Sequence, residues 1–324
     1  MKYLLLEPYG INNDPFYFAV EKWVLENIHE INEDVCFLWN VYGAVIIGKH
    51  QVLEAEVNTE YLKSNNIPVY RRPSGGGAVY SDEGCIKYSF ISKTKTKEQL
   101  YKDSLITIKG FLKTLGLETE FSGRNDLTYK GFKFSGNAYY QTKNGKVLHG
   151  TILYETDLNI LAKVLNPNKE KLASKGVKSV RSRVTNLKEF IHLDEPIFRE
   201  KLQQYLNKET LLLSDYQLSK IREYQREFSQ KDYIYNKQPV YDILRTKRFE
   251  FGMVLVYLTV KSNRIEKVSI KGDFFFQKDV SELEVLLTNK ILDTSLKTYL
   301  KTVDVPSYIE GLTDDTLYQL LKGD

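Results

Sequence analysis

The segment Arg71-Arg72-Pro73-Ser74-Gly75-Gly76-Gly77-Ala78-Val79-Tyr80 constrains this chain most, because it joins two apolar runs typical of strands, Ile67–Arg71 and Ile86–Ile91. Three consecutive glycines expose backbone N–H groups and let a ligand approach closely. Two arginines add positive charge, so the segment suits a phosphate or a carboxylate, with a tight structural turn as the alternative. It is neither a Walker A loop nor a G-x-G-x-x-G fingerprint, because no Gly-Lys-Ser/Thr follows and Tyr80 takes the third glycine position.

Two further motifs are Gly123-Arg124-Asn125-Asp126-Leu127 and Lys133-Phe134-Ser135-Gly136-Asn137-Ala138. Asn125 and Asp126 could hold a metal or a ribose hydroxyl, or could form an Asx turn. Lys133 has phenylalanine on either side, which could partly desolvate its ammonium and aim it at a ligand. A strand lysine that points to solvent is the alternative.

Asn144-Gly145 predicts a hairpin between strands at Asn137–Thr142 and Lys146–Tyr154. His149-Gly150-Thr151 lies in the second strand, where we interpret His149 as a hydrogen-bonded structural residue. None of the four histidines has the H-x-x-x-H spacing of zinc hydrolases, and no G-x-S-x-G elbow occurs.

The segment from Lys163 to Lys188 holds eight basic residues and one acidic residue, and it ends in Lys175-Gly176-Val177-Lys178-Ser179-Val180-Arg181-Ser182-Arg183-Val184-Thr185-Asn186-Leu187. The mixture of Gly, Ser, Lys and Arg predicts a mobile basic loop, which is either a solvated charged face or a site for phosphate.

Apolar spacing and end signals predict helices at several places. One begins at Asp14-Pro15, another spans Lys97–Leu115, and a third begins at Ser214 with Gln217 completing a capping box. Further helices are expected from Asp194-Glu195-Pro196, at Ser281–Asn289 and at Thr313–Leu321. Further strands are expected at 3–6, Cys36–Val41, Ala44–Ile47, Phe249–Val260 and Ile265–Lys271. The 324 residues suit two domains, and the change in pattern near residues 236–247 predicts the boundary.

Composition excludes several classes of protein. The two cysteines, Cys36 and Cys85, rule out a disulfide scaffold and Cys-only zinc sites, and favour a reducing cytoplasm. The apolar runs are far shorter than a membrane span needs, and we expect neither a signal peptide nor membrane attachment. A net charge of +4 is too weak to indicate nucleic-acid binding by itself. Aromatic residues make up 13%, which favours pockets for flat or apolar ligands.

These motifs, in this order, resemble the lipoate–protein ligase A family. The resemblance rests on the Arg-Arg-x-Ser-Gly-Gly-Gly-Ala-Val-Tyr, Gly-Arg-Asn-Asp-Leu, Lys-x-Ser-Gly-Asn-Ala and His-Gly-Thr motifs and on the long basic segment. The tail, with Lys247-Arg248-Phe249 and Gly272-Asp273-Phe274-Phe275, is similar to the accessory domain of that family. The resemblance implies an α+β fold of the biotin/lipoate ligase type, with a mixed-sheet catalytic domain at 1–240 and a small α/β accessory domain at 241–324.

The resemblance also implies a reaction. (R)-Lipoate attacks the α-phosphate of ATP to give lipoyl-adenylate, and a lysine of an apo-lipoyl domain then takes the acyl group. The acceptors would be 2-oxoacid dehydrogenase E2 subunits or the glycine-cleavage H protein, and Mg²⁺ is expected on the pyrophosphate, with Asn125 and Asp126 as candidate ligands. Lys133 matches the catalytic lysine of the family.

The remaining site residues are carried over from the same motifs. Those expected to bind ATP and lipoyl-adenylate are Arg71, Arg72, Ser74, Gly75, Gly76, Gly77, Ala78, Val79, Tyr80, Asn125, Asp126, Lys133, Ser135, Gly136, Ala138, His149, Gly150 and Thr151. Those expected in the adenylate-binding loop are Lys175, Gly176, Val177, Ser179, Val180, Arg181, Arg183, Val184 and Asn186.

Two alternatives stay open, an acyl transferase and a nucleic-acid-binding protein, while a biotin ligase is disfavoured. ATP-independent octanoyl or lipoyl transferases share the catalytic fold and sometimes pass the acyl group through a cysteine, although we expect Cys85 to be a buried structural thiol. Biotin ligases carry a Gly-Arg-Gly-Arg-type loop that this sequence lacks. A non-catalytic nucleic-acid-binding protein would use the basic segment and show a steep salt dependence.

Overall fold

The computed structural model describes residues 1–10, 12–123, 125–165, 183–235 and 241–323. Its main element is an eight-stranded sheet in the order β11-β1-β2-β6-β10-β9-β8-β7. The strands are β1 (Lys2–Leu4), β2 (Val35–Trp39), β6 (Cys85–Ser92), β7 (Glu120–Ser122), β8 (Asp126–Tyr129), β9 (Phe132–Thr142), β10 (Gly145–Leu153) and β11 (Thr210–Leu211). Strand β1 pairs in parallel with both of its neighbours and the other pairs are antiparallel, so the sheet is mixed as expected.

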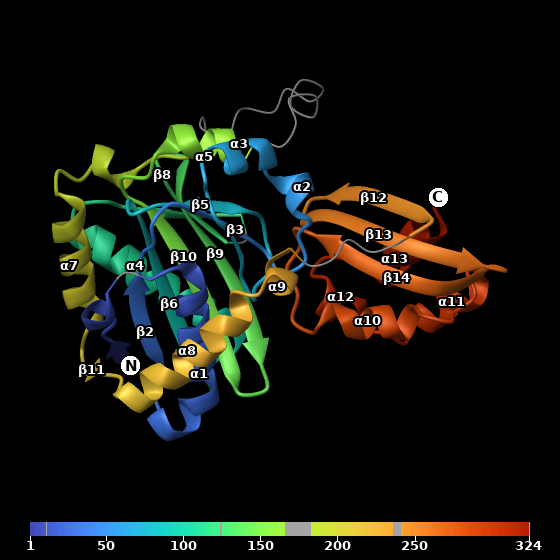
Figure 1. The fold of residues 1–324 in the computed structure, drawn as a ribbon, viewed down its shortest axis with the longest axis horizontal. Coiled ribbons are helices and arrows are strands. Elements are labelled where there is room, and N and C mark those ends of the chain that lie inside the picture. The colour runs from blue at the N-terminus through green and yellow to red at the C-terminus, as the bar shows by residue number, and fades with distance from the viewer. Residues whose placement is uncertain (11, 124, 166–182, 236–240, 324) are drawn as a thin grey trace.

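Helices cover both faces of this sheet (Figure 1). Helices α1 (Asp14–Ile31) and α8 (Asp215–Phe228) pack on one face, and α4 (Lys97–Thr114) and α7 (Glu195–Leu206) pack on the other. Local signals explain where they begin: Pro15 occupies the first turn of α1, and both α4 and α8 open with a capping box.

A second, smaller sheet in the order β4-β3-β5 lies beside the large one. Its strands are β3 (Ala44–Ile47), β4 (Val69–Arg71) and β5 (Val79–Ser81), and α2 (Leu53–Glu56), α3 (Thr59–Ser64), α5 (Leu158–Val164) and α9 (Lys231–Tyr235) are short helices on this side of the domain. The glycine-rich segment connects β4 to β5. The sequence did not predict β5 or these short helices, because each carries too few residues for a clear periodicity.

The C-terminal region has its own apolar core. A three-stranded antiparallel sheet, β12 (Ile243–Phe249), β13 (Gly252–Lys261) and β14 (Arg264–Gly272), packs against α10 (Val280–Leu287), α11 (Thr294–Leu300), α12 (Val305–Tyr308) and α13 (Asp314–Lys322). The expectation of a single strand over Phe249–Val260 was wrong: Phe249 ends one strand, and the chain turns before Gly252, whose φ is 144°. The sequence segment assigned to the domain boundary therefore contains the start of β12.

Candidate active site

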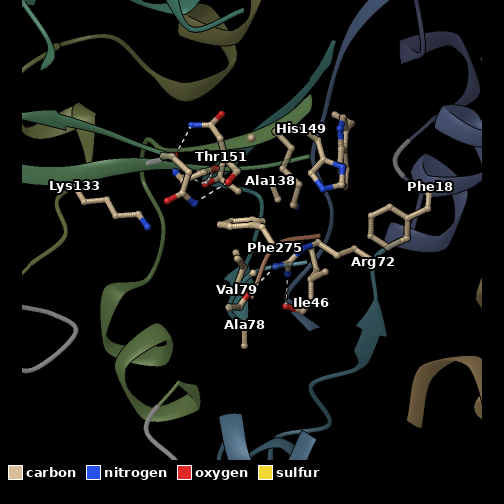
Figure 2. A pocket seen from close by; sticks show the side chains of 18 residues that line it. Phe18, Ile46, Arg72, Ala78, Val79, Lys133, Ala138, His149, Thr151 and Phe275 are labelled. Atoms are coloured by element: carbon tan, nitrogen blue, oxygen red, sulfur yellow. Dashed lines mark hydrogen bonds between the residues drawn. The ribbon is translucent and has the colours of Figure 1, made fainter. Parts of the chain in front are cut away.

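A cavity of about 140 Å³ lies between the two sheets of the N-terminal domain. Figure 2 shows Lys133 toward one end of the cavity and Phe18 at the other, with His149, Arg72 and Phe275 between them. Twelve of the expected site residues line the cavity: Arg72, Gly76, Gly77, Ala78, Val79, Asn125, Lys133, Gly136, Ala138, His149, Gly150 and Thr151. Long-range strand pairing brings them together, since His149 on β10 lies opposite Ala138 on β9.

Lys133 is aimed by an irregularity in the sheet. The register of β8 against β9 shifts between Leu127 and Thr128, which leaves Phe134 as an extra residue on β9. The Lys133 side chain lies over Gly136, where an added Cβ would come within 3.1 Å of its Nζ. Its ammonium lies 2.8 Å from the Asp126 carboxylate and the side chain is 39% exposed, so the ammonium can exchange this partner for another anion.

The backbone of Lys133 also holds the end of the basic segment. Its N–H donates to the carbonyl of Arg183 at 2.8 Å, and its carbonyl accepts from the N–H of Thr185 at 2.9 Å, so Val184 forms a parallel bridge with Lys133. Asn186 bonds the backbone of Thr156 in both directions. The expected loop residues Lys175, Gly176, Val177, Ser179, Val180 and Arg181 lie outside the described residues.

Arg72 braces the glycine-rich segment. Its buried guanidinium donates to the Ser74 hydroxyl and to the carbonyls of Gly75 and Gly77. Burial, followed by the charge of Arg71, lowers the pKa of Arg72 to about 10, so the side chain stays protonated at neutral pH. The cavity therefore has a fixed positive charge beside its glycines.

Arg71 has a different environment from the one expected. Its guanidinium donates to the carbonyls of Tyr233 and Ile234 on one side, and to those of Gly48, Lys49 and Gln51 on the other. It is 2% exposed and does not line the cavity. Five other expected residues also do not line the cavity: Ser74, Gly75, Tyr80, Asp126 and Ser135.

A buried hydrogen-bond chain runs behind the cavity wall. Nδ1 of His149 lies 2.9 Å from the Glu21 carboxylate, and Nε2 lies 2.7 Å from the Ser74 hydroxyl. Because a carboxylate only accepts, Nδ1 of His149 donates to Glu21. Ser74 in turn accepts from Nε of Arg72. The prediction that His149 is hydrogen-bonded is confirmed, and the chain connects Glu21 to Arg72.

The other end of the cavity is mainly apolar, and sequence reasoning missed it. Phe18 from α1, Trp39 from β2 and Ile46 from β3 line it, together with Lys87 from β6. The ammonium of Lys87 lies 4.8 Å from the centre of the Trp39 ring and 3.9 Å from the Asp14 carboxylate. Lys87 is the one charged residue within Ile86–Ile91, a segment expected to be a buried strand, and this was a visible signal of the buried cation.

Glycine is required where the cavity floor is most crowded. A Cβ on Gly150 would overlap the side chains of Asn137 and Tyr88, which are hydrogen-bonded to each other. Asn137 also exchanges hydrogen bonds with Asn125, its Nδ2 reaching the Asn125 carbonyl at 3.0 Å. These contacts hold Asn125 and Asn137, which both line the cavity, in one arrangement.

The C-terminal domain completes the cavity with Phe275. The carbonyl of Phe274 accepts from the N–H of Gly76 at 3.2 Å, and the Gly272 N–H donates to the His50 carbonyl at 2.9 Å. The Lys49 ammonium lies 2.7 Å from the Asp279 carboxylate. Burial raises the pKa of Asp279, but this hydrogen bond and those from Ser281 outweigh it and hold the pKa below its ordinary value. The accessory domain is thus seated directly on the glycine-rich segment.

Comparison with known families decides the identity of the chain. Residues 14–210 match the lipoyl protein ligase A/B catalytic domain, and residues 238–321 match the bacterial lipoate protein ligase C-terminus. The lipoate-protein ligase LplJ of Bacillus subtilis is 34% identical over 98% of this chain and 99% of its own length. Lipoate–protein ligase 1 of Staphylococcus aureus is 32% identical over 97% of this chain and 98% of its own length. The chain belongs to the lipoate–protein ligase family.

Solved structures show the same fold for this ligase. LipL1 of P. falciparum in complex with lipoate superposes with a TM-score of 0.79 at 23% identity, over 99% of this chain and 98% of that one. Lipoate-protein ligase A bound with ATP gives a TM-score of 0.62 at 24% identity, over 72% of this chain and 98% of that one. The α+β fold with a mixed sheet, expected from the sequence, is confirmed. In the described part of the ligase, no helix is long and apolar enough to cross a membrane.

Proposed function

We propose that this ligase activates free (R)-lipoate with ATP and transfers the lipoyl group to a specific lysine of an apo-lipoyl domain. In the first step a lipoate carboxylate oxygen bonds to the α-phosphorus of ATP, and pyrophosphate leaves. In the second step the lysine amine attacks the acyl carbon, AMP leaves, and the amine loses a proton. Neither step needs a nucleophile from the enzyme, so positioning and charge stabilisation carry the catalysis.

The shape and polarity of the cavity carry this proposal. A ligand with a carboxylate at one end and an apolar tail at the other fits a cavity with Lys133 at one end and Phe18, Trp39 and Ile46 at the other. The dithiolane end would contact the aromatic side chains, and the carboxylate would replace Asp126 as the partner of Lys133. Two solved relatives support these ligands, since one is described in complex with lipoate and another as bound with ATP.

Lys133 would stabilise the negative charge that builds up on the carboxylate and the α-phosphate. Arg72 and the glycines beside it would contribute positive charge and close backbone approach. Gly76 already gives its N–H to Phe274, so phosphate binding by that group would require this contact to open. The basic loop would exclude water from the adenylate, which would otherwise be hydrolysed.

Mg²⁺ fits the oxygen donors available near Lys133. Among the described residues no group of three or more His, Cys, Asp or Glu side chains could form a metal site, so a cage made by the protein alone is not available there. Asp126 offers a carboxylate oxygen and Asn125 an amide oxygen, which suits a cation held mainly by phosphate and water. Bound there, Mg²⁺ would neutralise charge on the pyrophosphate as it leaves.

The acceptor would be an apo-lipoyl domain of a 2-oxoacid dehydrogenase E2 subunit or the glycine-cleavage H protein. An archaeal relative, the bipartite ligase of Thermoplasma acidophilum, is described together with its E2 lipoyl domain. It is 27% identical, with a TM-score of 0.65 over 74% of this chain and 98% of that chain. A cytoplasmic location and the absence of nucleic-acid and membrane partners stay predictions.

The alternative is ATP-independent acyl transfer through a cysteine. Cys85 and Cys36 are both buried, and burial raises the pKa of each thiol, which opposes formation of the nucleophilic thiolate. Cys85 packs in the core beneath the small sheet and does not line the cavity. The expectation of a buried thiol is confirmed, and this observation favours the ATP-dependent reaction.

The test is ATP–pyrophosphate exchange with purified protein, Mg²⁺ and lipoate, in the absence of acceptor. We expect exchange that depends on lipoate. If folded protein with saturating ligands gives no exchange, the ATP-dependent reaction is refuted. Octanoyl or lipoyl transfer from a donor protein, with Cys85 replaced, becomes the next measurement in that case.

A further inference from the structure

We propose that a second cavity, next to the reaction cavity, receives the side chain of the acceptor lysine. This inference rests on the proposed function, because it assigns a binding site for the second substrate of that reaction. The second cavity, here called the amine slot, has a volume of about 420 Å³. It lies between the first half of α4, β7, β9 and the accessory domain. Its lining combines aromatic, apolar and charged side chains: Lys97, Glu98, Tyr101, Lys102, Leu105, Phe121, Asn125, Tyr139, Phe275 and Glu310.

The amine slot adjoins the reaction cavity. Asn125 and Phe275 line both cavities, and the reaction cavity also contains Lys133. The proposed function places the acyl carbonyl beside Lys133, which is where the acceptor amine must arrive. A lysine side chain lying in the amine slot would pass Asn125 and Phe275 before it meets that carbonyl.

The lining of the amine slot suits the two parts of a lysine side chain. Apolar and aromatic surface from Tyr101, Leu105, Phe121 and Tyr139 can pack on the methylene stem. The Glu98 carboxylate can attract the ammonium before it is deprotonated, while the Glu310 carboxylate already pairs with Lys97. One lysine of the ligase itself already makes contacts of this kind.

That lysine is Lys97. Its ammonium pairs with the Glu310 carboxylate and lies 5.4 Å from the centre of the Tyr139 ring. An ammonium is therefore stable in this slot between a carboxylate and the face of an aromatic ring, as cation–π attraction predicts. Lys97 also connects α4 to the accessory domain, which places the slot at the junction of the two domains.

The charge of the amine slot does not favour a second nucleotide. The charged residues among the described lining are Lys97, Lys102, Glu98 and Glu310, so their formal charges cancel and a polyphosphate gains no net attraction. Hydrogen bonds from the backbone and from Thr96 lower the pKa of Glu98, which keeps its carboxylate ionised. Glu98 is thus suited to attract the ammonium rather than to remove its proton.

The first experiment blocks the slot chemically. Phe121→Cys replaces a lining residue that is 52% exposed, and Ile197→Cys on α7, where the native residue is 45% exposed, is the matched control. Both native cysteines are buried, so a bulky maleimide reacts at the introduced thiol. We measure the KM for an apo-lipoyl domain with synthetic lipoyl-adenylate as the donor.

Two further measurements separate the half-reactions. Lipoate-dependent ATP–pyrophosphate exchange reports adenylation, and hydroxamate formation with hydroxylamine reports attack on the adenylate by a nucleophile too small to need the slot. We expect the label at residue 121 to raise the acceptor KM about tenfold or more over the labelled control, in the range typical of a lost aromatic contact. Exchange and hydroxamate formation keep the rates of the control.

The outcomes are distinct. An acceptor KM equal to that of the labelled control overturns the amine slot and leaves the proposed function intact. A label at residue 121 that slows exchange as much as transfer also overturns it, because the cavity then serves adenylation. If the unmodified ligase shows no exchange at all, the proposed function fails, and the inference fails with it.

A second variant tests the charge of the slot. Glu98→Gln removes the carboxylate and keeps a side chain that can form hydrogen bonds, while Glu118→Gln is the control, since Glu118 is exposed and pairs with Lys113 outside the slot. We expect only Glu98→Gln to raise the acceptor KM, by about threefold, with kcat for transfer unchanged. Equal values for both variants overturn the role of this carboxylate.

Discussion

Replacing Glu21 with glutamine tests whether the buried chain behind the cavity holds the site together. The fully buried Glu21 carboxylate accepts from the Ser89 hydroxyl at 2.7 Å, from Nδ1 of His149 at 2.9 Å and from the Tyr140 hydroxyl at 3.2 Å. A glutamine is neutral and has one acceptor oxygen, which can still serve Ser89 and His149, while its NH2 group would face the Tyr140 hydroxyl and make that hydroxyl the acceptor. All three hydrogen bonds therefore lose their charged acceptor.

The magnitude follows from those contacts. A hydrogen bond to a charged group contributes about 1.5–3 kcal/mol and one to a neutral group about 0.5–1.5 kcal/mol, so each of the three contacts loses about 1 kcal/mol. We expect Glu21→Gln to lower the free energy of unfolding by about 3 kcal/mol. Tyr140→Phe removes only the longest of the three contacts and should cost about 1 kcal/mol.

Urea unfolding of both variants, followed by far-UV circular dichroism, gives the comparison. The KM for lipoate in pyrophosphate exchange gives the functional readout, which should rise in Glu21→Gln because His149 lines the cavity and connects through Ser74 to Arg72. If Glu21→Gln costs no more than Tyr140→Phe and leaves KM unchanged, the reasoning about this chain is refuted.

Lys133→Ala should reduce lipoate-dependent exchange at least about 100-fold, because the charge stabilisation by Lys133 is lost. The thermal unfolding temperature should stay near that of wild type, because the side chain is 39% exposed. Exchange near the wild-type rate would contradict the role of Lys133. Gly150→Ala should destabilise the fold by about 3 kcal/mol in urea unfolding, since its Cβ would overlap Tyr88. Burial raises the pKa of Asp14 from 3.8 to about 6, so the folded state binds this proton more tightly than the unfolded state. The free energy of unfolding of wild type, minus that of Asp14→Asn, should therefore fall by about 3 kcal/mol as the pH rises from about 4 to about 6, and should stay constant above about pH 6. If urea unfolding gives the same difference at every pH, this reasoning is contradicted. Deleting residues 241–324 should impair exchange, because the accessory domain contacts the glycine-rich segment; normal exchange by the truncated ligase would count against that.

Several elements of this fold are predicted by local sequence alone. The capping box at Ser214, proline in the first turn of α1 and the Asn144-Gly145 turn each act within a few residues, so they specify helix starts and a hairpin without the rest of the fold. The order of the glycine-rich, Asn-Asp, lysine and histidine motifs was also enough to indicate the family. The predicted bounds of α4 differ from the observed ones by a single residue.

Tertiary structure decided which residues form the site. Arg71 and Arg72 are neighbours with the same chemistry, but they lie in different surroundings: five backbone carbonyls from distant segments surround one guanidinium, and the other faces the cavity. Phe18, Lys87 and Phe275 come from three segments that only long-range pairing and domain packing bring together. Local periodicity tells which side of a strand is apolar, but a cavity forms where elements distant in sequence fail to fill the space between them, so its lining depends on the complete fold.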